Sequence, residues 1–140
     1  MTLPSDGRVF VAYADGASRG NPGPSAVGVV IYNGEGLEVH RESRRIGHGT
    51  NNEAEYRAAI AALEAAIGLG AERVELRMDS ELVVRQLTGR YRVRNSRLKP
   101  LHGRLLDLRA RLESVAFRNV PRTGNRLADM LANQALDRSS

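Results

Sequence analysis

Two glutamates open a segment of helical periodicity, the stretch HGTNNEAEYRAAIAALEAA at residues 48–66. At about 100° per residue, Glu55 falls within the apolar arc beside Tyr56, whereas Glu53 falls on the other side in line with Arg57. The ordinary interpretation of Glu53 is a solvated acid near a helix N-terminus, paired with Arg57 at i,i+4. A carboxylate turned toward a core, as predicted for Glu55, is costly unless a metal ion or hydrogen bonds compensate.

Three aspartates extend this set of candidate acids. Asp15 ends the predicted strand RVFVAYAD, and Asp79 ends the predicted strand RVELRMD. If these strands are parallel neighbours, both side chains project at one edge of the sheet, where open α/β folds place ligands. Asp129 lies in the first two turns of the last predicted helix, where a simple helix-opening acid is the alternative. Clustered carboxylates without His or Cys suit Mg²⁺ or Mn²⁺ rather than zinc, and paired ions of this kind cleave phosphodiesters.

The elements that must position these acids follow from apolar periodicity and turn residues. Turn formers concentrate at residues 16–24, and NGEG at residues 33–36 predicts a tight hairpin that joins two strands of an antiparallel meander. The sequence predicts strands at 8–15, 25–33, 37–46, 73–79 and 114–121, and helices at 51–68, 80–89, 98–113 and 124–137. This order is typical of a mixed α/β domain.

The apolar faces of two helices are also predicted. In the helix at 51–68 the stripe consists of Tyr56, Ile60, Leu63 and Ile67, widened by neighbouring alanines. In the last helix the predicted buried face consists of Leu127, Leu131 and Ala135, with Met130 beside them.

Composition limits the class of protein. The 140 residues, 41% of them hydrophobic, are expected to form one domain over 1–140, without an apolar run long enough to span a membrane. Cysteine is absent, and the start MTLPSDGR lacks the features of a signal peptide, so we expect a cytoplasmic location. A small single domain of this kind is expected to be a monomer. The net charge of +5 favours a polyanionic partner, although the preference for Arg over Lys could also reflect genome composition.

Four segments together resemble the type 1 ribonuclease H family over nearly the whole chain: YADGASRGNPGPSAVGVV, TNNEAEYRAAIAALEAA, MDSELVVRQLTGRY and NRLADMLANQAL. The resemblance implies a ribonuclease H-like fold, a mixed five-stranded sheet of three antiparallel and then two parallel strands with helices on both faces. It also implies an endoribonuclease that hydrolyses the RNA strand of RNA–DNA hybrids to 5′-phosphate and 3′-hydroxyl ends. The implied cofactors are two Mg²⁺ ions, with Mn²⁺ as a substitute, held by Asp15, Glu55, Asp79 and Asp129.

The resemblance further implies a set of substrate contacts. Asn51 and Asn52 would read the minor groove of the hybrid, and Thr50 would form part of a pocket for a DNA phosphate. The backbone from Gly16 to Ser18 would approach the RNA 2′-hydroxyl, which distinguishes RNA from DNA. Capping of the helix by side-chain oxygens is the alternative role of Thr-Asn-Asn. The full implied set is Gly16, Ala17, Ser18, Asn21, Thr50, Asn51 and Asn52.

Two departures from the family pattern concern basic residues. Many members carry a His before the last helix, but this chain reads VPRTGN there, with Arg122 nearby. Arginine stays protonated and cannot act as a base, so contact with the scissile phosphate or help in product release is the expected role. The loop GRYRVRNSRLK is short and lacks the basic handle of some relatives. Arg90, Arg92 and Arg94 are expected to grip the DNA strand, and a solvated surface loop is the alternative.

Two other functions compete with this interpretation. A non-catalytic nucleic-acid binding module of the same fold would be expected to lack one of the four acids, and none is missing. A different nuclease of this fold, such as a 3′–5′ exonuclease, is disfavoured by the TNN and GNPGP segments.

Overall fold

The computed structural model describes residues 8–138, so the prediction about a signal peptide at residues 1–7 lies outside it. Its elements, in chain order, are β1 (Val9–Ser18), β2 (Gly23–Tyr32), β3 (Glu38–Gly49), α1 (Asn51–Gly68), β4 (Arg73–Met78), α2 (Glu81–Leu87), α3 (Leu98–Ala110), β5 (Ser114–Asn119), the 3₁₀ turn η2 (Arg122–Gly124) and α4 (Arg126–Asp137). No helix within residues 8–138 is long and apolar enough to cross a membrane.

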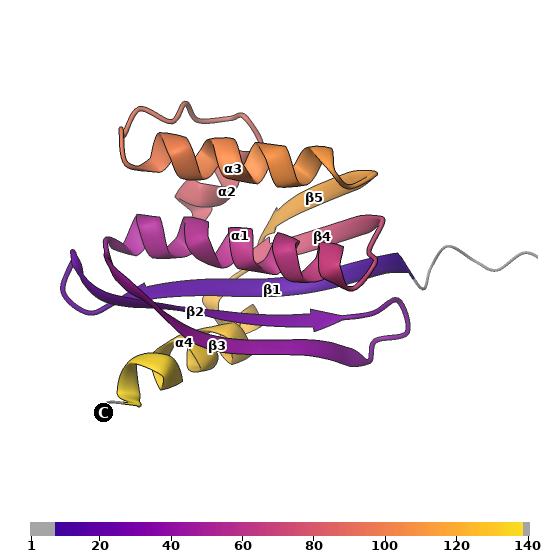
Figure 1. Ribbon diagram of the computed structural model, residues 1–140, viewed down its shortest axis with the longest axis horizontal. Helices are drawn as coiled ribbons and strands as arrows, with labels where there is room; N and C mark the ends of the chain where they lie inside the picture. Colours follow the sequence, from indigo (N-terminus) through magenta and orange to yellow (C-terminus); the bar gives the residue numbers. More distant parts are fainter. Residues whose placement is uncertain (1–7, 139–140) are drawn as a thin grey trace, which may run out of the picture.

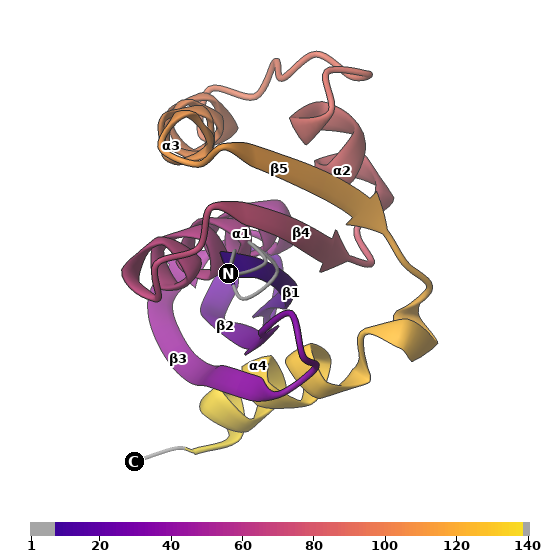
Figure 2. The ribbon, with the colours of Figure 1, turned by 90° about the vertical axis from the view of Figure 1, so that its right-hand side faces the viewer.

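The strands form one sheet in the order β3-β2-β1-β4-β5 (Figure 1). β1 pairs antiparallel with β2, and β2 pairs antiparallel with β3. β4 runs parallel to β1 and to β5, which confirms the predicted mixed sheet. Helix α1 packs on β1 and β2 and carries α3, whereas α4 packs against the opposite face over β2, β1 and β3 (Figures 1 and 2). The prediction of helices on both faces is therefore confirmed.

The main core lies between α1 and the sheet. Alternate residues of β1 (Phe10, Ala12 and Ala14) are buried beneath this helix. The predicted stripe of α1 is only partly right, because Ile60 and Ile67 are half-buried at its margin. The centre of the contact consists mainly of fully buried alanines, whose small side chains let the helix backbone lie close to the strands: Ala54, Ala58, Ala59, Ala62 and Ala66.

Two strands run past their predicted ends. β1 continues to Ser18 instead of ending at Asp15, and β3 continues to Gly49 instead of residue 46. The reason is pairing with β2, in which Ser18 lies opposite Ser25 and Gly49 lies opposite Gly23. The Gly, Ser and Pro residues that suggested a long turn are mostly accommodated in paired strands, and the ladder itself supplies their hydrogen bonds.

The buried face of α4 differs from its prediction in two residues, one of which is Leu127, only half-buried at the margin of the face. Leu131 and Ala135 are buried as expected, but Met130 is 45% exposed, and Ala128 and Ala132 take its place against the sheet. The small residues matter because α4 crosses β2 very closely at Gly28. A Cβ at Gly28 would lie 2.1 Å from the Ala128 carbonyl oxygen and 2.6 Å from the Ala132 nitrogen.

Gly28→Ala is therefore expected to lower the free energy of unfolding by about 3 kcal/mol, the upper end of the usual cost of overpacking, because backbone atoms of α4 must move. Chemical denaturation would measure the change. Gly68→Ala is the matched control, since a Cβ there meets nothing within 4 Å and a helical Ala is favoured over Gly. Equal stability of the two variants would contradict the close approach of α4 to β2.

Candidate active site

The site forms where β1 and β4 part. Their pairing ends at Tyr13 and Arg77, so Asp79, directly after β4, has no opposing strand partner on that side. The prediction that Asp15 ends its strand is wrong, because it lies inside β1 opposite Gly28 of β2. The predicted parallel pairing of the two strands is confirmed, and it brings the two aspartates to one edge of the sheet.

Two asparagines stabilise this opening in the sheet. The side-chain amide of Asn125 donates to the Ala14 carbonyl at 3.0 Å, and that of Asn119 donates to the Met78 carbonyl at 3.2 Å. Both acceptors belong to residues just before the aspartates. Asn125 is only 1% exposed, so its hydrogen bond satisfies a buried backbone acceptor that strand pairing leaves free.

Glu55 reaches the same place from α1. Its Oε1 accepts a hydrogen bond from the Gly16 backbone N–H at 2.8 Å, which confirms that this glutamate faces the interior. The contact needs glycine, since a Cβ at position 16 would lie 2.2 Å from the Ala54 carbonyl group. One ligand oxygen each of Asp15, Glu55 and Asp79 lies within 4.8 Å of the others.

Glu53 has a different task from its neighbour. Its carboxylate accepts from the Thr50 N–H at 2.9 Å while Thr50 Oγ1 accepts from the Glu53 N–H at 3.1 Å. This reciprocal pair is a capping box at the start of α1. Within residues 8–138, Glu53 forms no direct ion pair with Arg57, because the cap holds the carboxylate at the end of the helix. The hydrogen bond from the Thr50 N–H and, to a smaller extent, the charge of Arg57 still lower the pKa of Glu53.

The carboxylates carry strongly perturbed acidities. Burial, together with the charges of Glu55 and Asp79, raises the pKa of Asp15 to about 10. Burial also raises the pKa of Glu55 to about 7, although the Gly16 N–H opposes the change. Burial likewise raises the pKa of Asp79, and the positive charge of Arg122 offsets part of this effect. Oxygen donors that repel one another in this way fit a divalent cation, which would favour their ionised forms.

A cleft of about 480 Å³ collects most of the predicted residues. Among the predicted set, Asn21, Thr50, Asn52, Arg90, Arg92 and Arg94 do not line it. The residues that line it are Asp15, Gly16, Ala17, Ser18, Asn51, Glu55, Asp79, Ser80, Arg122, Asp129 and Asn133. All four predicted catalytic acids and Arg122 thus share one cleft with four of the ten predicted substrate contacts.

The wall of the cleft is an interlocked set of polar groups. The Ser18 N–H donates to Asn51 Oδ1 at 3.1 Å, and the Asn51 N–H donates to Asn21 Oδ1 at 2.9 Å. Ser18 Oγ also donates to the Gly49 carbonyl at 2.7 Å. Capping, the alternative considered for Thr-Asn-Asn, is correct for Thr50, whereas Asn52 is exposed. These bonds fix the end of β1 against the start of α1 before any ligand binds.

The basic loop lies apart from the carboxylates. Arg90 and Arg92 line a hollow of about 740 Å³ beside α2 and α3, and Arg94 is exposed. Within the loop, the Tyr91 hydroxyl accepts from Arg85 of α2 at 2.7 Å, and the Arg85 guanidinium stacks over the Tyr91 ring. This contact ties the loop to α2, and none of its three predicted arginines forms an ion pair within residues 8–138.

Besides Asn119 at the end of β5, two asparagines of the site were not predicted. Asn125 lies at the entrance of α4, and Asn133 lies one helical turn after Asp129. The i,i+4 spacing of Asp129 and Asn133 is a sequence signal that could have identified the second. The first had no local signal, since its partner Ala14 is 111 positions away in the sequence.

Comparison with known proteins agrees with this geometry. Residues 13–135 match the family described as "Reverse transcriptase-like". The chain is 50% identical over 131 residues to "Ribonuclease HI" of Halobacterium salinarum, covering 94% of this chain and 65% of that protein. The chain belongs to the type 1 ribonuclease H family. The match spans a little under two thirds of the length of the Halobacterium salinarum protein.

Two solved ribonuclease H structures are similar over the whole described fold. The crystal structure of RNase H1 from Halobacterium salinarum NRC-1 has a TM-score of 0.91 at 47% identity, covering 94% of this chain and 99% of that one. LC11-RNase H1 in complex with RNA/DNA hybrid has a TM-score of 0.87 at 41% identity, covering 91% and 96%. The sheet order and helix arrangement described above are thus those of ribonuclease H1.

Proposed function

We propose that this chain is an endoribonuclease that hydrolyses the RNA strand of RNA–DNA hybrids, leaving 5′-phosphate and 3′-hydroxyl ends. The observation that carries the proposal is the convergence of four carboxylates from β1, α1, the end of β4 and α4 in one cleft. Support also comes from the 41% identical LC11-RNase H1, whose structure is a complex with RNA/DNA hybrid. The net charge of +5 suits a polyanionic substrate.

The donor set fits divalent cations, and we propose Asp15, Glu55, Asp79 and Asp129 as the residues that hold two Mg²⁺ ions, with Mn²⁺ as a substitute. When bound, such a pair supplies activation of the attacking water and stabilisation of the leaving oxygen. The chain's own contribution is placement. The Gly16 N–H orients Glu55, and the strand pairing of Asp15 with Gly28 fixes the backbone of that aspartate.

Neighbouring groups are proposed to hold the substrate. Arg122 shares the cleft with the carboxylates and carries a permanent positive charge, which suits contact with the scissile phosphate. The backbone from Gly16 to Ser18 forms the rim beside Glu55, where it is proposed to meet the RNA 2′-hydroxyl. Asn51, braced by Asn21, is proposed to reach the minor groove.

The decisive experiment is a cleavage assay with a hybrid labelled on its RNA strand. Single-stranded RNA, double-stranded RNA and double-stranded DNA serve as parallel substrates, each with Mg²⁺, Mn²⁺ or EDTA. We expect cutting of the hybrid's RNA strand with either metal and no cutting in EDTA. Tight binding of the hybrid without cutting in either metal would overturn the proposal in favour of a non-catalytic binding module.

The loop arginines give a separate prediction. Replacement of Arg90, Arg92 and Arg94 together by alanine should weaken hybrid binding and reduce the slope of log K against log salt by up to about three, with turnover of bound substrate unchanged. Binding titrations at several salt concentrations would measure the slope. Arg109→Ala is a single-charge reference, because it removes one exposed arginine that lines the same hollow from α3. An unchanged slope in the triple variant would identify the segment as a solvated loop.

A further inference from the structure

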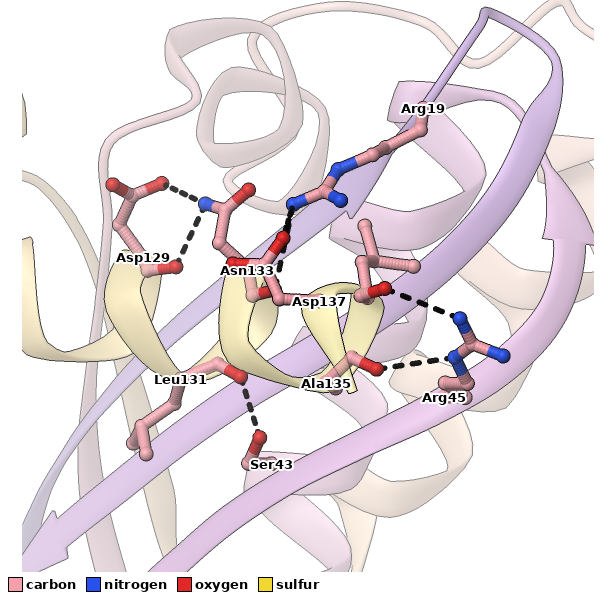
Figure 3. Close-up of polar contacts among 9 residues, drawn as sticks. Arg19, Ser43, Arg45, Asp129, Leu131, Asn133, Ala135 and Asp137 are labelled. Carbon is pink, nitrogen blue, oxygen red and sulfur yellow. Dashed lines mark hydrogen bonds and ion pairs between the residues drawn. The ribbon is translucent and has the colours of Figure 1, made fainter. Parts of the chain in front are cut away.

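Asp129 is the one candidate metal ligand carried by α4, and a single side chain holds it from the next turn of that helix. Asn133 Nδ2 donates to Asp129 Oδ1 at 3.2 Å and to the Asp129 carbonyl at 2.9 Å (Figure 3). Asn133 is half-buried and lines the same cleft as the four carboxylates. The amide therefore contacts both the backbone and the carboxylate of the acid, which restricts rotation of the carboxylate about its last side-chain bond.

The backbone of α4 around Asn133 is anchored by two arginines from other elements. The Arg19 guanidinium, from the turn after β1, reaches the Asn133 carbonyl at 3.5 Å and the Asp137 carboxylate at 2.5 Å (Figure 3). On the β3 side, Arg45 donates to the Ala135 carbonyl at 3.1 Å. The Arg45 contact satisfies a carbonyl in the last turn of α4, and the two arginines together anchor the helix to the turn after β1 and to β3.

Ordinary helix stability does not account for this asparagine. Alanine is a better helix former than asparagine at an interior position. The side-chain amide of Asn133 forms no hydrogen bond to another element of the described fold, since both of its acceptors belong to Asp129. What the Asn133 amide does is orient the Asp129 carboxylate, which lines the cleft.

We propose that Asn133 is a positioning residue for the metal site, which holds the Asp129 carboxylate toward Asp15, Glu55 and Asp79. This inference rests on the proposed function, because it assigns Asp129 to the cation site. Partners that orient a ligand from behind typically change metal affinity or activity by 10–100-fold when removed. Arg19 connects α4 to the turn that follows the proposed substrate-binding rim, because it lies in that turn and contacts Asn133 and Asp137.

The test compares Asn133→Ala with Gln134→Ala, which removes an amide from the exposed neighbouring position of the same helix. Isothermal titration with Mn²⁺ in the absence of nucleic acid measures metal affinity, and hybrid cleavage measures kcat and KM. We expect Asn133→Ala to weaken Mn²⁺ binding by about 10-fold or more and to lower kcat with KM for the hybrid unchanged. Gln134→Ala should match the wild type, and thermal unfolding should show both variants folded.

The outcomes separate this inference from the proposed function. Wild-type Mn²⁺ affinity in folded Asn133→Ala would overturn the positioning role even if the wild-type protein cleaves hybrids. A loss confined to KM would also overturn it, because it would make Asn133 a substrate contact. Weakened Mn²⁺ binding in Asn133→Ala would support the role even if the wild-type protein fails to cut a hybrid, a result that would count only against the proposed reaction.

Discussion

Glu55→Gln is expected to abolish metal-dependent cleavage of the hybrid, with a loss of roughly 10³-fold or more, while binding of the hybrid survives. The substitution keeps the size of the side chain and an oxygen for the 2.8 Å hydrogen bond from the Gly16 N–H. It removes the negative charge that a cation needs at this point of the carboxylate cluster. Single-turnover cleavage assays with saturating enzyme would measure the loss in the chemical step.

Glu53→Gln is the matched control, because the same substitution is made two residues earlier on the same helix. Glutamine can still complete the capping box with Thr50, so we expect a cost of at most a few tenths of a kcal/mol in stability and near-normal cleavage. Loss of cleavage in Glu53→Gln with normal cleavage in Glu55→Gln would contradict both the helix geometry and the family assignment of this site.

Asp15→Asn is expected to abolish cleavage as well and to stabilise the metal-free protein at neutral and alkaline pH. The pKa of Asp15 is raised to about 10 and that of Glu55 to about 7 by burial and by neighbouring carboxylates. The folded protein therefore binds more protons than the unfolded chain above about pH 4, and its stability falls as the pH rises toward those folded values. Asparagine at position 15 does not titrate, so it removes the larger of the two contributions to this loss of stability.

The measurement is the free energy of unfolding in EDTA at pH 5 and pH 9. We expect the wild-type protein to be less stable at pH 9 than at pH 5, and Asp15→Asn to show a smaller decrease. At this chain length each kcal/mol corresponds to about 2–4 °C in Tm. Added Mg²⁺ should stabilise the wild type more than the variant, because a cation favours the ionised carboxylates.

A surface substitution tests whether the effect belongs to the cluster. Asp107→Asn removes the same charge from an exposed position on α3 and should leave the difference between pH 5 and pH 9 unchanged. If Asp15→Asn proves less stable than the wild type in EDTA at pH 9, the carboxylates do not repel one another as the geometry implies.

The sequence by itself determined the chemical set and the order of the elements. Glu55 could be separated from Glu53 because both lie on one regular helix, where 100° per residue fixes which side chain faces the interior. Asp79 could be placed at a strand end because its strand is short and bounded by local signals. The hairpin at residues 33–36 is similarly local, with Asn33 Oδ1 accepting from the Glu35 and Leu37 N–H groups.

Only the tertiary structure decided where strands end and which groups meet across long sequence separations. β1 continues through Gly16 and Ser18 because β2 offers hydrogen-bond partners there, and local propensity carries no information about those partners. Met130 is exposed because the crossing of α4 at Gly28 brings small residues against the sheet. Asn125 supports the site through Ala14, from the other end of the chain. A helix or turn is specified by its neighbours in sequence, whereas a strand edge and a carboxylate cluster depend on surfaces that exist only once the chain has folded.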